Sequence, residues 1–102
     1  MLEIRPNCEC CDKDLPFDST EAMICSYECT YCMKCVNDIL ENVCPNCGGG
    51  FTPRPIRPKV ARRSGTSIEH QWASTERVHT KYNMGELKAF SENAKHIKPE
   101  HR

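Results

Sequence analysis

Nine cysteines constrain this chain more than any other feature, because all of them lie between positions 8 and 47 of the 102 residues. Eight of them form four pairs, with two or three residues between the members of a pair. A pair at this spacing lies on a tight turn that directs both sulfurs at one ion, and two such pairs complete a tetrahedral shell of thiolates. The pattern predicts two structural zinc ions held by Cys8/Cys11, Cys25/Cys29, Cys32/Cys35 and Cys44/Cys47.

The ninth cysteine, Cys10, lies inside the first pair. The two-residue spacing of Cys8 and Cys11 lets backbone N–H groups of the turn point at the first sulfur, which favours these two as ligands. Cys10 is then a spare thiol, and the alternative is that it replaces Cys8 or Cys11. Acidic neighbours such as Glu9 and Asp12 predict a raised pKa and low reactivity for the spare thiol.

The cysteine segment has few apolar residues for a segment of about 40 residues, a size at which metals or disulfides usually replace part of the core. We therefore expect metal binding and folding to be one equilibrium.

Residues 1–6 contain no apolar run typical of a secretory signal, and no segment has the composition of a membrane span. We expect a cytoplasmic protein with no membrane partner, whose reduced cysteines bind metal.

The net charge of zero conceals two halves of opposite sign. Residues 1–51 carry three basic and nine acidic side chains, net −6, whereas residues 52–102 carry eleven basic and five acidic ones, net +6. Two zinc ions on eight thiolates would add about −4 to the first half. We expect the two halves to attract each other.

Hydrophobic spacing indicates a few short elements around the cysteines. Residues 22–25 have the composition of a short strand that delivers Cys25. From Met33 to about Asn42 the spacing becomes helical, and an apolar stripe is formed by Val36, Ile39, Leu40 and Val43. Pro45 ends the helix, and Gly48 permits the positive φ that a metal-binding turn commonly needs.

Spacing alone leaves two arrangements of ligands open. In a sequential arrangement, the four inner cysteines hold one ion and the outer pairs hold the other. In an interleaved arrangement, the first and third pairs share one ion and the second and fourth pairs share the other.

The order of four pairs, with a long first loop, a short helix before the last pair and a final Cys44-Pro45-Asn46-Cys47, resembles the RING finger in an all-cysteine form. RING fingers use the interleaved, cross-braced arrangement. The resemblance covers residues 8–48 and implies two sites, which are Cys8, Cys11, Cys32 and Cys35 (site 1) and Cys25, Cys29, Cys44 and Cys47 (site 2).

A second resemblance extends further along the chain. It rests on Leu-Glu-Ile-Arg-Pro-Asn-Cys-Glu-Cys-Cys at the start, on Cys-Pro-Asn-Cys-Gly-Gly, and on the following Arg-Pro-Ile-Arg-Pro. These stretches are similar to a bacterial family of small cysteine-rich proteins catalogued as domain of unknown function twelve seventy-two. The resemblance implies a bacterial source and metal binding, but no activity.

Enzymatic activity is not expected. RING ubiquitin ligases dock their conjugating enzyme on an apolar residue after the first ligand, an apolar or aromatic residue in the helix and the proline of the last pair. A basic residue after the last ligand then contacts ubiquitin. Pro45 matches this set and Ile39 or Leu40 could serve in the helix, but Glu9 follows Cys8 and Gly48 follows Cys47. A catalytic zinc needs an open position, whereas the cysteine segment has only closed four-sulfur shells, and all histidines lie in the second half, at His70, His79, His96 and His101.

After a flexible Gly48–Gly50, residues 52–66 are rich in proline and arginine and predict an extended, basic linker. The basic arm at residues 54–63 has two interpretations. In the first, the arm binds nucleic acid or an acidic groove of another protein. In the second, it is a linker that lies back on the acidic first half of the chain. The absence of interleaved aromatic residues weakens the nucleic-acid interpretation.

Residues 67–102 contain two narrow apolar stripes at helical spacing. The first comprises Ile68, Trp72, Thr75, His79 and Tyr82, with Ser67 as a cap and residues 83–85 as a stop; the second comprises Leu87, Phe90, Ala94 and Ile97, ahead of Pro99. Such narrow stripes need a surface to lie on. Candidates are the cysteine segment, the other helix, a second copy of the chain in a homo-oligomer, or an unrelated partner.

Together these patterns predict a small, metal-dominated α+β fold. It has a RING-like, cross-braced two-zinc head at residues 1–51, a Pro/Arg-rich linker at 52–66, and a tail of one or two amphipathic helices at 67–102. The function that we expect is a non-catalytic zinc-binding adaptor that contacts an unidentified protein partner. The alternatives are a RING-type ubiquitin-ligase-like protein and a nucleic-acid-binding regulator.

Overall fold

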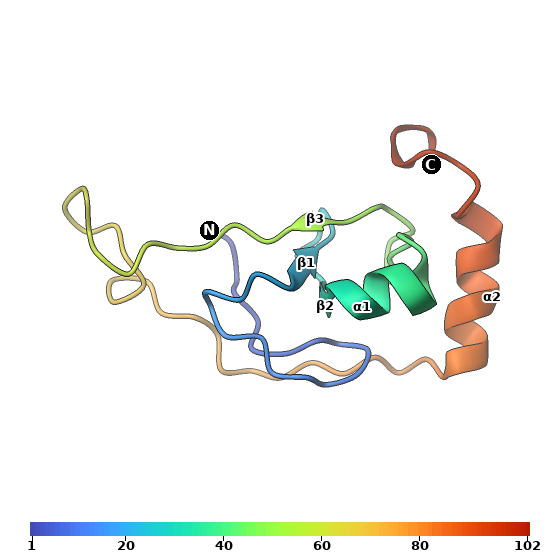
Figure 1. Ribbon diagram of the computed structural model, residues 1–102, viewed down its shortest axis with the longest axis horizontal. Coiled ribbons are helices and arrows are strands. Elements are labelled where there is room, and N and C mark those ends of the chain that lie inside the picture. Colours follow the sequence, from blue (N-terminus) through green and yellow to red (C-terminus); the bar gives the residue numbers. More distant parts are fainter.

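A computed structural model, which describes residues 1–102, shows a small sheet and a short helix in the head and one longer helix in the tail (Figure 1). The strands are β1 (Ala22–Ile24), β2 (Thr30–Cys32) and β3 (Thr52–Pro53). The helices are α1 (Met33–Cys35), which continues into the π-helical η1 (Val36–Leu40), then α2 (Met84–Ala94) and the 3-10 turn η2 (Pro99–His101). The molecule is elongated, with extents of 45 × 27 × 18 Å.

The sheet is antiparallel and places β1 between β2 and β3. Ala22 is paired with Cys32 and Ile24 with Thr30, so that β1 ends next to Cys25 while β2 ends at Cys32. The strand predicted at residues 22–25 is confirmed for Ala22–Ile24. This small sheet therefore fixes the relative positions of one cysteine from each predicted metal site.

The helix predicted from Met33 is confirmed at its start, where the Cys32 side chain caps it by accepting a hydrogen bond from the backbone N–H of Cys35. It ends at Leu40 and not at about Asn42, because Glu41 and Asn42 adopt left-handed conformations with φ of 48° and 62°. The apolar stripe still faces inward, since Val36 and Leu40 are buried.

Six of the thirteen residues in the main buried cluster are cysteines, as expected for a head with few apolar residues. The largest buried side chain is Tyr31, whose ring meets that of Phe51 edge-on, with centroids 5.3 Å apart. Sulfur atoms therefore make up much of the core, so that a metal ion held by them would add directly to the stability of the fold.

The helix predicted around residues 68–82 is wrong. Residues 67–71 form a turn, and residues 72–80 run without regular secondary structure back along the first cysteine loop (Figure 1). The backbone N–H of Ser74 donates to the carbonyl of Ile4 at 2.9 Å, and that of Thr80 donates to the carbonyl of Glu9 at 2.7 Å. These contacts to the head satisfy backbone groups that a helix would have paired internally. Trp72, expected in the buried stripe, is 73% exposed.

The second tail helix is confirmed as α2. Asn83, predicted as a stop for the previous helix, instead begins α2 through a capping box with Glu86. Leu87 is buried, and the Ser91 hydroxyl donates to the carbonyl of Leu40 at 2.9 Å. The surface that this helix needs is thus supplied by the head, at η1.

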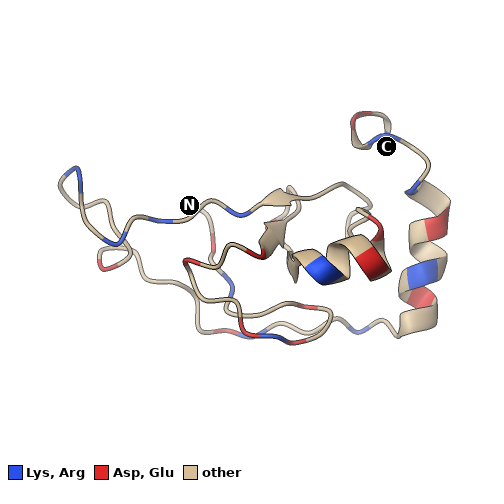
Figure 2. Cartoon of the chain, in the orientation of Figure 1, with Lys and Arg blue, Asp and Glu red and all other residues tan.

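The Pro/Arg-rich segment packs on the head. β3 pairs with β1, and the guanidinium of Arg54, 4% exposed, donates to the carbonyls of Arg5 and Pro16 at 2.8 Å each. Charged pairs of the expected sign also join the halves, such as Lys95 with Glu41 at 3.1 Å. Basic residues lie along the loop that projects from the head (Figure 2). No helix in the structure has the length and apolar character needed to cross a membrane.

Candidate metal centre

Site 1 forms where the first cysteine loop meets the junction of β2 and α1. The sulfurs of Cys8, Cys11, Cys32 and Cys35 all lie within 4.8 Å of one another. The Cys11 and Cys32 sulfurs are 3.9 Å apart. Zinc–sulfur bonds of about 2.3 Å place the sulfurs of a tetrahedral shell about 3.8 Å apart, so this group fits a zinc ion.

Backbone turns hold the sulfurs of site 1 in place. The N–H of Cys11 points at the Cys8 sulfur and that of Cys35 at the Cys32 sulfur, each at 3.5 Å. Such donors stabilise the thiolate form, which is the form that binds metal. This is the arrangement expected for a Cys-x-x-Cys pair, and it supports Cys8 over Cys10 as the first member of the group.

Site 2 lies between the end of β1 and the turn that follows η1. The sulfurs of Cys25, Cys44 and Cys47 lie within 4.8 Å of one another. The N–H of Gly49 points at the Cys47 sulfur at 3.4 Å, and Gly48 has the predicted positive φ, of 78°. Cys29 is buried and its thiol interacts with that of Cys44, which affects the pKa of both, but it lies outside the 4.8 Å group. Its role as the fourth ligand therefore stays a prediction.

The pairs interleave along the chain. The first pair meets the third, and the fourth pair meets Cys25 of the second. This is the cross-braced arrangement, and the sequential one would have required the four inner cysteines to meet. Cys32, the last residue of β2, belongs to site 1, and Cys25, which directly follows β1, belongs to site 2.

Burial sets the protonation of several thiols. It raises the pKa of Cys8 and that of Cys25 to about 11, since a thiolate loses hydration in the core. The hydrogen bond between Cys29 and Cys44 lowers the pKa of Cys29 to about 5 and raises that of Cys44. The amide of Asn46, which donates to the Cys29 sulfur at 3.3 Å, acts in the same direction on Cys29. A metal ion at either site must therefore displace protons from buried thiols.

Cys10 lies outside both groups. It is half-buried and packs against the core cluster. Its pKa is raised, as predicted, but the main cause is burial and not the acidic neighbours that the sequence suggested. All four histidines are exposed, and none belongs to either sulfur group.

Glu9 is the residue that sequence reasoning misplaced. We expected it on an exposed docking face, but it is 1% exposed and lies next to Cys8 in the core. Its carboxylate accepts from Arg5 at 2.7 Å and from the backbone N–H of Thr30 at 2.6 Å. Burial raises the pKa of Glu9, and these two donors oppose the shift. The spacing of Arg5 and Glu9, four residues apart, was the signal that could have suggested the pair.

Comparison with known proteins agrees with a small cysteine-rich family. A family model described as "Protein of unknown function (DUF1272)" matches residues 1–57, which include both sulfur groups. An uncharacterized protein of Rhizobium meliloti (strain 1021) is 51% identical over 78 residues, which cover 76% of this chain and 86% of that protein. No solved structure matches the chain.

Proposed function

The chain belongs to the DUF1272 family, and we propose that it is a zinc-binding adaptor in which two structural zinc ions shape a non-catalytic surface for a protein partner. The observation that carries this proposal is the presence of two sulfur groups formed by interleaved cysteine pairs. A chain with so small an apolar core gains its fold by closing such groups on metal ions.

Zinc is the ion that suits these donors best. Both groups consist of cysteine sulfur alone, and most of the sulfurs are buried in the core, with Cys11 and Cys47 exposed. Four thiolates close the tetrahedral shell of zinc and leave no position for water or substrate. The zinc ions would supply folding energy and fixed geometry, so we propose a structural role for both.

Two features of the head support a protein that is not a ubiquitin ligase. The residue after the first ligand, Glu9, is buried and paired with Arg5, so it offers no surface to a conjugating enzyme. Pro45, the position that fits the ligase set, is buried, and Tyr82 and Phe90 of the tail line a cleft beside it. The tail thus lies where a conjugating enzyme would need free access.

The basic arm gives limited support to nucleic-acid binding. Arg54 and Arg57 donate to backbone carbonyls of the head and tail, and Lys59 lies 3.3 Å from the Asp18 carboxylate. Only Arg62 and Arg63 of the arm are exposed without a protein partner in the structure. Two phosphate contacts release few counterions, so the expected affinity for nucleic acid is low. We therefore keep the adaptor as the proposed function.

Exposed aromatic residues favour a protein partner. Trp72 is 73% exposed, Tyr27 is 72% exposed, and Phe90 on α2 is 41% exposed. Aromatic side chains are enriched where protein surfaces meet, because they bury a large area with little loss of conformational entropy. A second copy of the chain, bound through the tail, is one such partner.

Native mass spectrometry of the purified chain tests the metal content. We expect two zinc ions per chain. Cys10→Ser should keep both, whereas Cys32→Ser combined with Cys35→Ser should keep one. Replacing zinc with cadmium-113 then identifies the ligands, since the remaining ion should couple to the β-protons of Cys25, Cys29, Cys44 and Cys47. One ion in the native chain, or loss of metal with Cys10→Ser, would refute the ligand assignment.

A capture experiment tests the adaptor role. The zinc-loaded chain, fixed on a support, is incubated with bacterial lysate, and the same chain stripped by a chelator serves as the control. We expect discrete proteins that only the loaded chain retains, because the stripped chain lacks its folded surface. If both forms retain the same proteins, the zinc ions do not shape the binding surface and the proposal fails.

A further inference from the structure

We propose that the cleft between α2 and the Cys44–Cys47 turn binds an arginine or lysine side chain of the partner protein. This inference rests on the proposed adaptor function and names the chemistry of the partner that the adaptor recognises. It derives from the shape, the walls and the charge of one cleft beside site 2.

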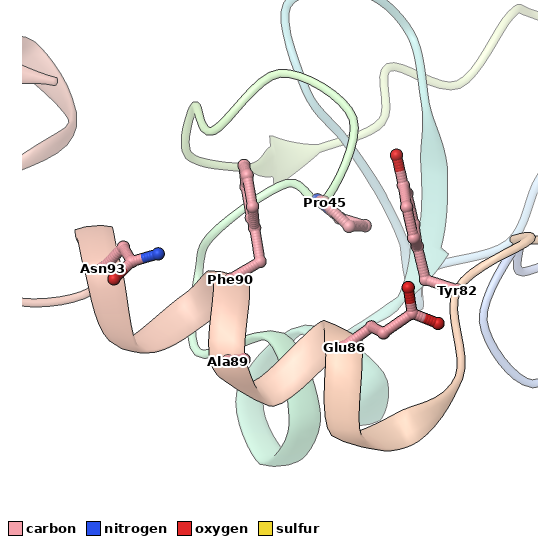
Figure 3. Close-up of a pocket in the computed structure, with 6 residues that line it drawn as sticks. All are labelled: Pro45, Tyr82, Glu86, Ala89, Phe90 and Asn93. Atoms are coloured by element: carbon pink, nitrogen blue, oxygen red, sulfur yellow. The ribbon is translucent and has the colours of Figure 1, made fainter.

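The cleft has a volume of about 320 Å³ and is lined by Pro45, Tyr82, Glu86, Ala89, Phe90 and Asn93. The rings of Tyr82 and Phe90 stand on either side of Pro45, and Glu86 extends from α2 beside Tyr82 (Figure 3). A volume of this size is at the small end of ligand pockets, which suits one long side chain better than a cofactor.

Hydrogen bonds and buried side chains hold the walls of the cleft in place. Glu86 is fixed by the capping box, in which its carboxylate accepts from the backbone N–H of Asn83 at 3.1 Å. α2 is anchored to the head by the buried Leu87 and by the hydrogen bond of Ser91 to Leu40. Pro45 is buried between two predicted zinc ligands. The cleft is therefore largely formed before a partner arrives, which limits the entropy lost on binding.

The charge around the cleft favours a cation. Glu86 is the one acidic or basic side chain among the lining residues, and one of its oxygens remains available beyond the capping box. Cys44 and Cys47 flank Pro45, and a zinc ion with four thiolates would carry a net charge of about −2. The head as a whole has a net charge of −6 before its thiols ionise. Although Lys81 lies beside Tyr82, the negative charges of Glu86, of the zinc–thiolate group and of the head would repel an anionic partner.

The aromatic walls narrow the choice to a cation with an apolar stem. Phe90 is 41% exposed although it stands on the side of α2 that faces Pro45, so its ring has apolar surface left to cover. Arginine and lysine bury a hydrocarbon stem against rings while their charge reaches a carboxylate. The Tyr82 ring already has one cation nearby, with Lys81 Nζ 5.5 Å from its centroid. A bare metal ion would find one carboxylate there and no further charged ligand.

A titration of the zinc-loaded, nitrogen-15-labelled full chain tests the inference by NMR. The probe is the blocked tripeptide acetyl-alanyl-arginyl-alanine amide, and the same peptide with citrulline in place of arginine is the neutral control. We expect the arginine peptide to shift the amide signals of Tyr82, Glu86 and Phe90. The citrulline peptide should bind at least about threefold more weakly, since it lacks the charge that meets Glu86.

Two variants and a matched control locate the effect. Glu86→Gln removes the charge but keeps the capping box, which accepts glutamine, and it should weaken binding of the arginine peptide at least about threefold. Phe90→Ala should weaken it as well, through the loss of one ring. Glu92→Gln is the control, because Glu92 lies on the same helix, pairs with Lys95 and does not line the cleft.

Three outcomes would overturn the inference. They are no shift at the cleft with millimolar peptide, equal shifts with the citrulline peptide, and cleft signals that move on dilution of the free chain, which would assign the cleft to a second copy. Metal analysis of the same sample separates this failure from that of the proposed function. A chain that holds both zinc ions but ignores the peptide refutes the cleft assignment alone.

Discussion

The side-chain amide of Asn7 forms two hydrogen bonds with the backbone of Val78, 71 positions further along the chain. Its Nδ2 donates to the Val78 carbonyl at 2.8 Å, and its Oδ1 accepts from the Val78 N–H at 3.3 Å. Asn7 is fully buried and directly precedes the first cysteine of site 1. One asparagine thus binds the tail in the way that a neighbouring strand would.

Asn7→Ala should detach the tail segment from the first cysteine loop. The substitution leaves both backbone groups of Val78 without a partner, and we expect a loss of about 1–3 kcal/mol in the free energy of unfolding. Hydrogen exchange of the zinc-loaded chain should become faster at residues 74–80 and stay unchanged in α2. Asn37→Ala, at an exposed position of η1, is the control. Unchanged protection of the tail in Asn7→Ala would contradict the role of this pair.

The contact of Asn7 with Val78 explains why part of the tail could not be predicted. The residues from Ile68 to Tyr82 show helical spacing, and periodicity reports only on which residues share a face. Periodicity contains no information on a hydrogen-bond partner about 70 residues away in the sequence. Here that partner, Asn7, holds the backbone at Val78 in a conformation that is not helical. α2 was predictable because its evidence is local, namely a stripe around Leu87 and the stop before Pro99.

The sulfur groups were predictable for the same reason. The spacing within each cysteine pair is a local property, and the turns that it implies are present at Cys11, Cys35 and Gly49. The choice of partner pairs is not local, since it depends on the β1–β2 register, and it came from resemblance to the RING finger. Burial of Glu9 and Arg54 was missed because composition assigns charged residues to the surface.

Arg54→Lys should destabilise the fold, although it keeps the positive charge. The Arg54 guanidinium donates to the carbonyls of Arg5, Leu15 and Pro16, and a lysine has no planar fork to reach all three. We expect a loss of about 1–3 kcal/mol in denaturant unfolding of the zinc-loaded chain. Arg63→Lys, in the exposed loop, should change stability by less than about 0.5 kcal/mol. Equal stability of the two variants would show that residues 52–66 are a linker only.

Glu9→Gln should destabilise the head more than the loss of a surface charge does. Glutamine can still accept from the Thr30 N–H, but it leaves the Arg5 guanidinium without its buried partner. We expect a loss of about 1–3 kcal/mol in the free energy of unfolding. In the control Glu21→Gln, the exposed pair with Lys13 is lost at a cost below about 1 kcal/mol. Similar losses in both variants would contradict the structural role of Glu9.

Zinc binding should release protons in a pattern that separates Cys25 from Cys29. Burial raises the pKa of Cys25 to about 11, so this thiol carries a proton at pH 7 until metal displaces it. The pKa of Cys29 is lowered to about 5 by its hydrogen bond with Cys44, so Cys29 is already ionised at pH 7. Each proton displaced makes zinc affinity fall about tenfold as the pH drops by one unit. Affinity is therefore lost on acidification, and Cys25 contributes to that loss whereas Cys29 does not.

Calorimetric titration at pH 7, in buffers with different heats of ionisation, counts these protons. Cys25→Ser should lower the number released per ion at site 2 by about one, because the displaced proton is absent. Cys29→Ser is the matched control. It should weaken zinc binding through the loss of a predicted ligand and leave the number of protons unchanged. An equal decrease in both variants would mean that Cys29 has an ordinary pKa in the metal-free chain, and that its interaction with the Cys44 thiol does not form there.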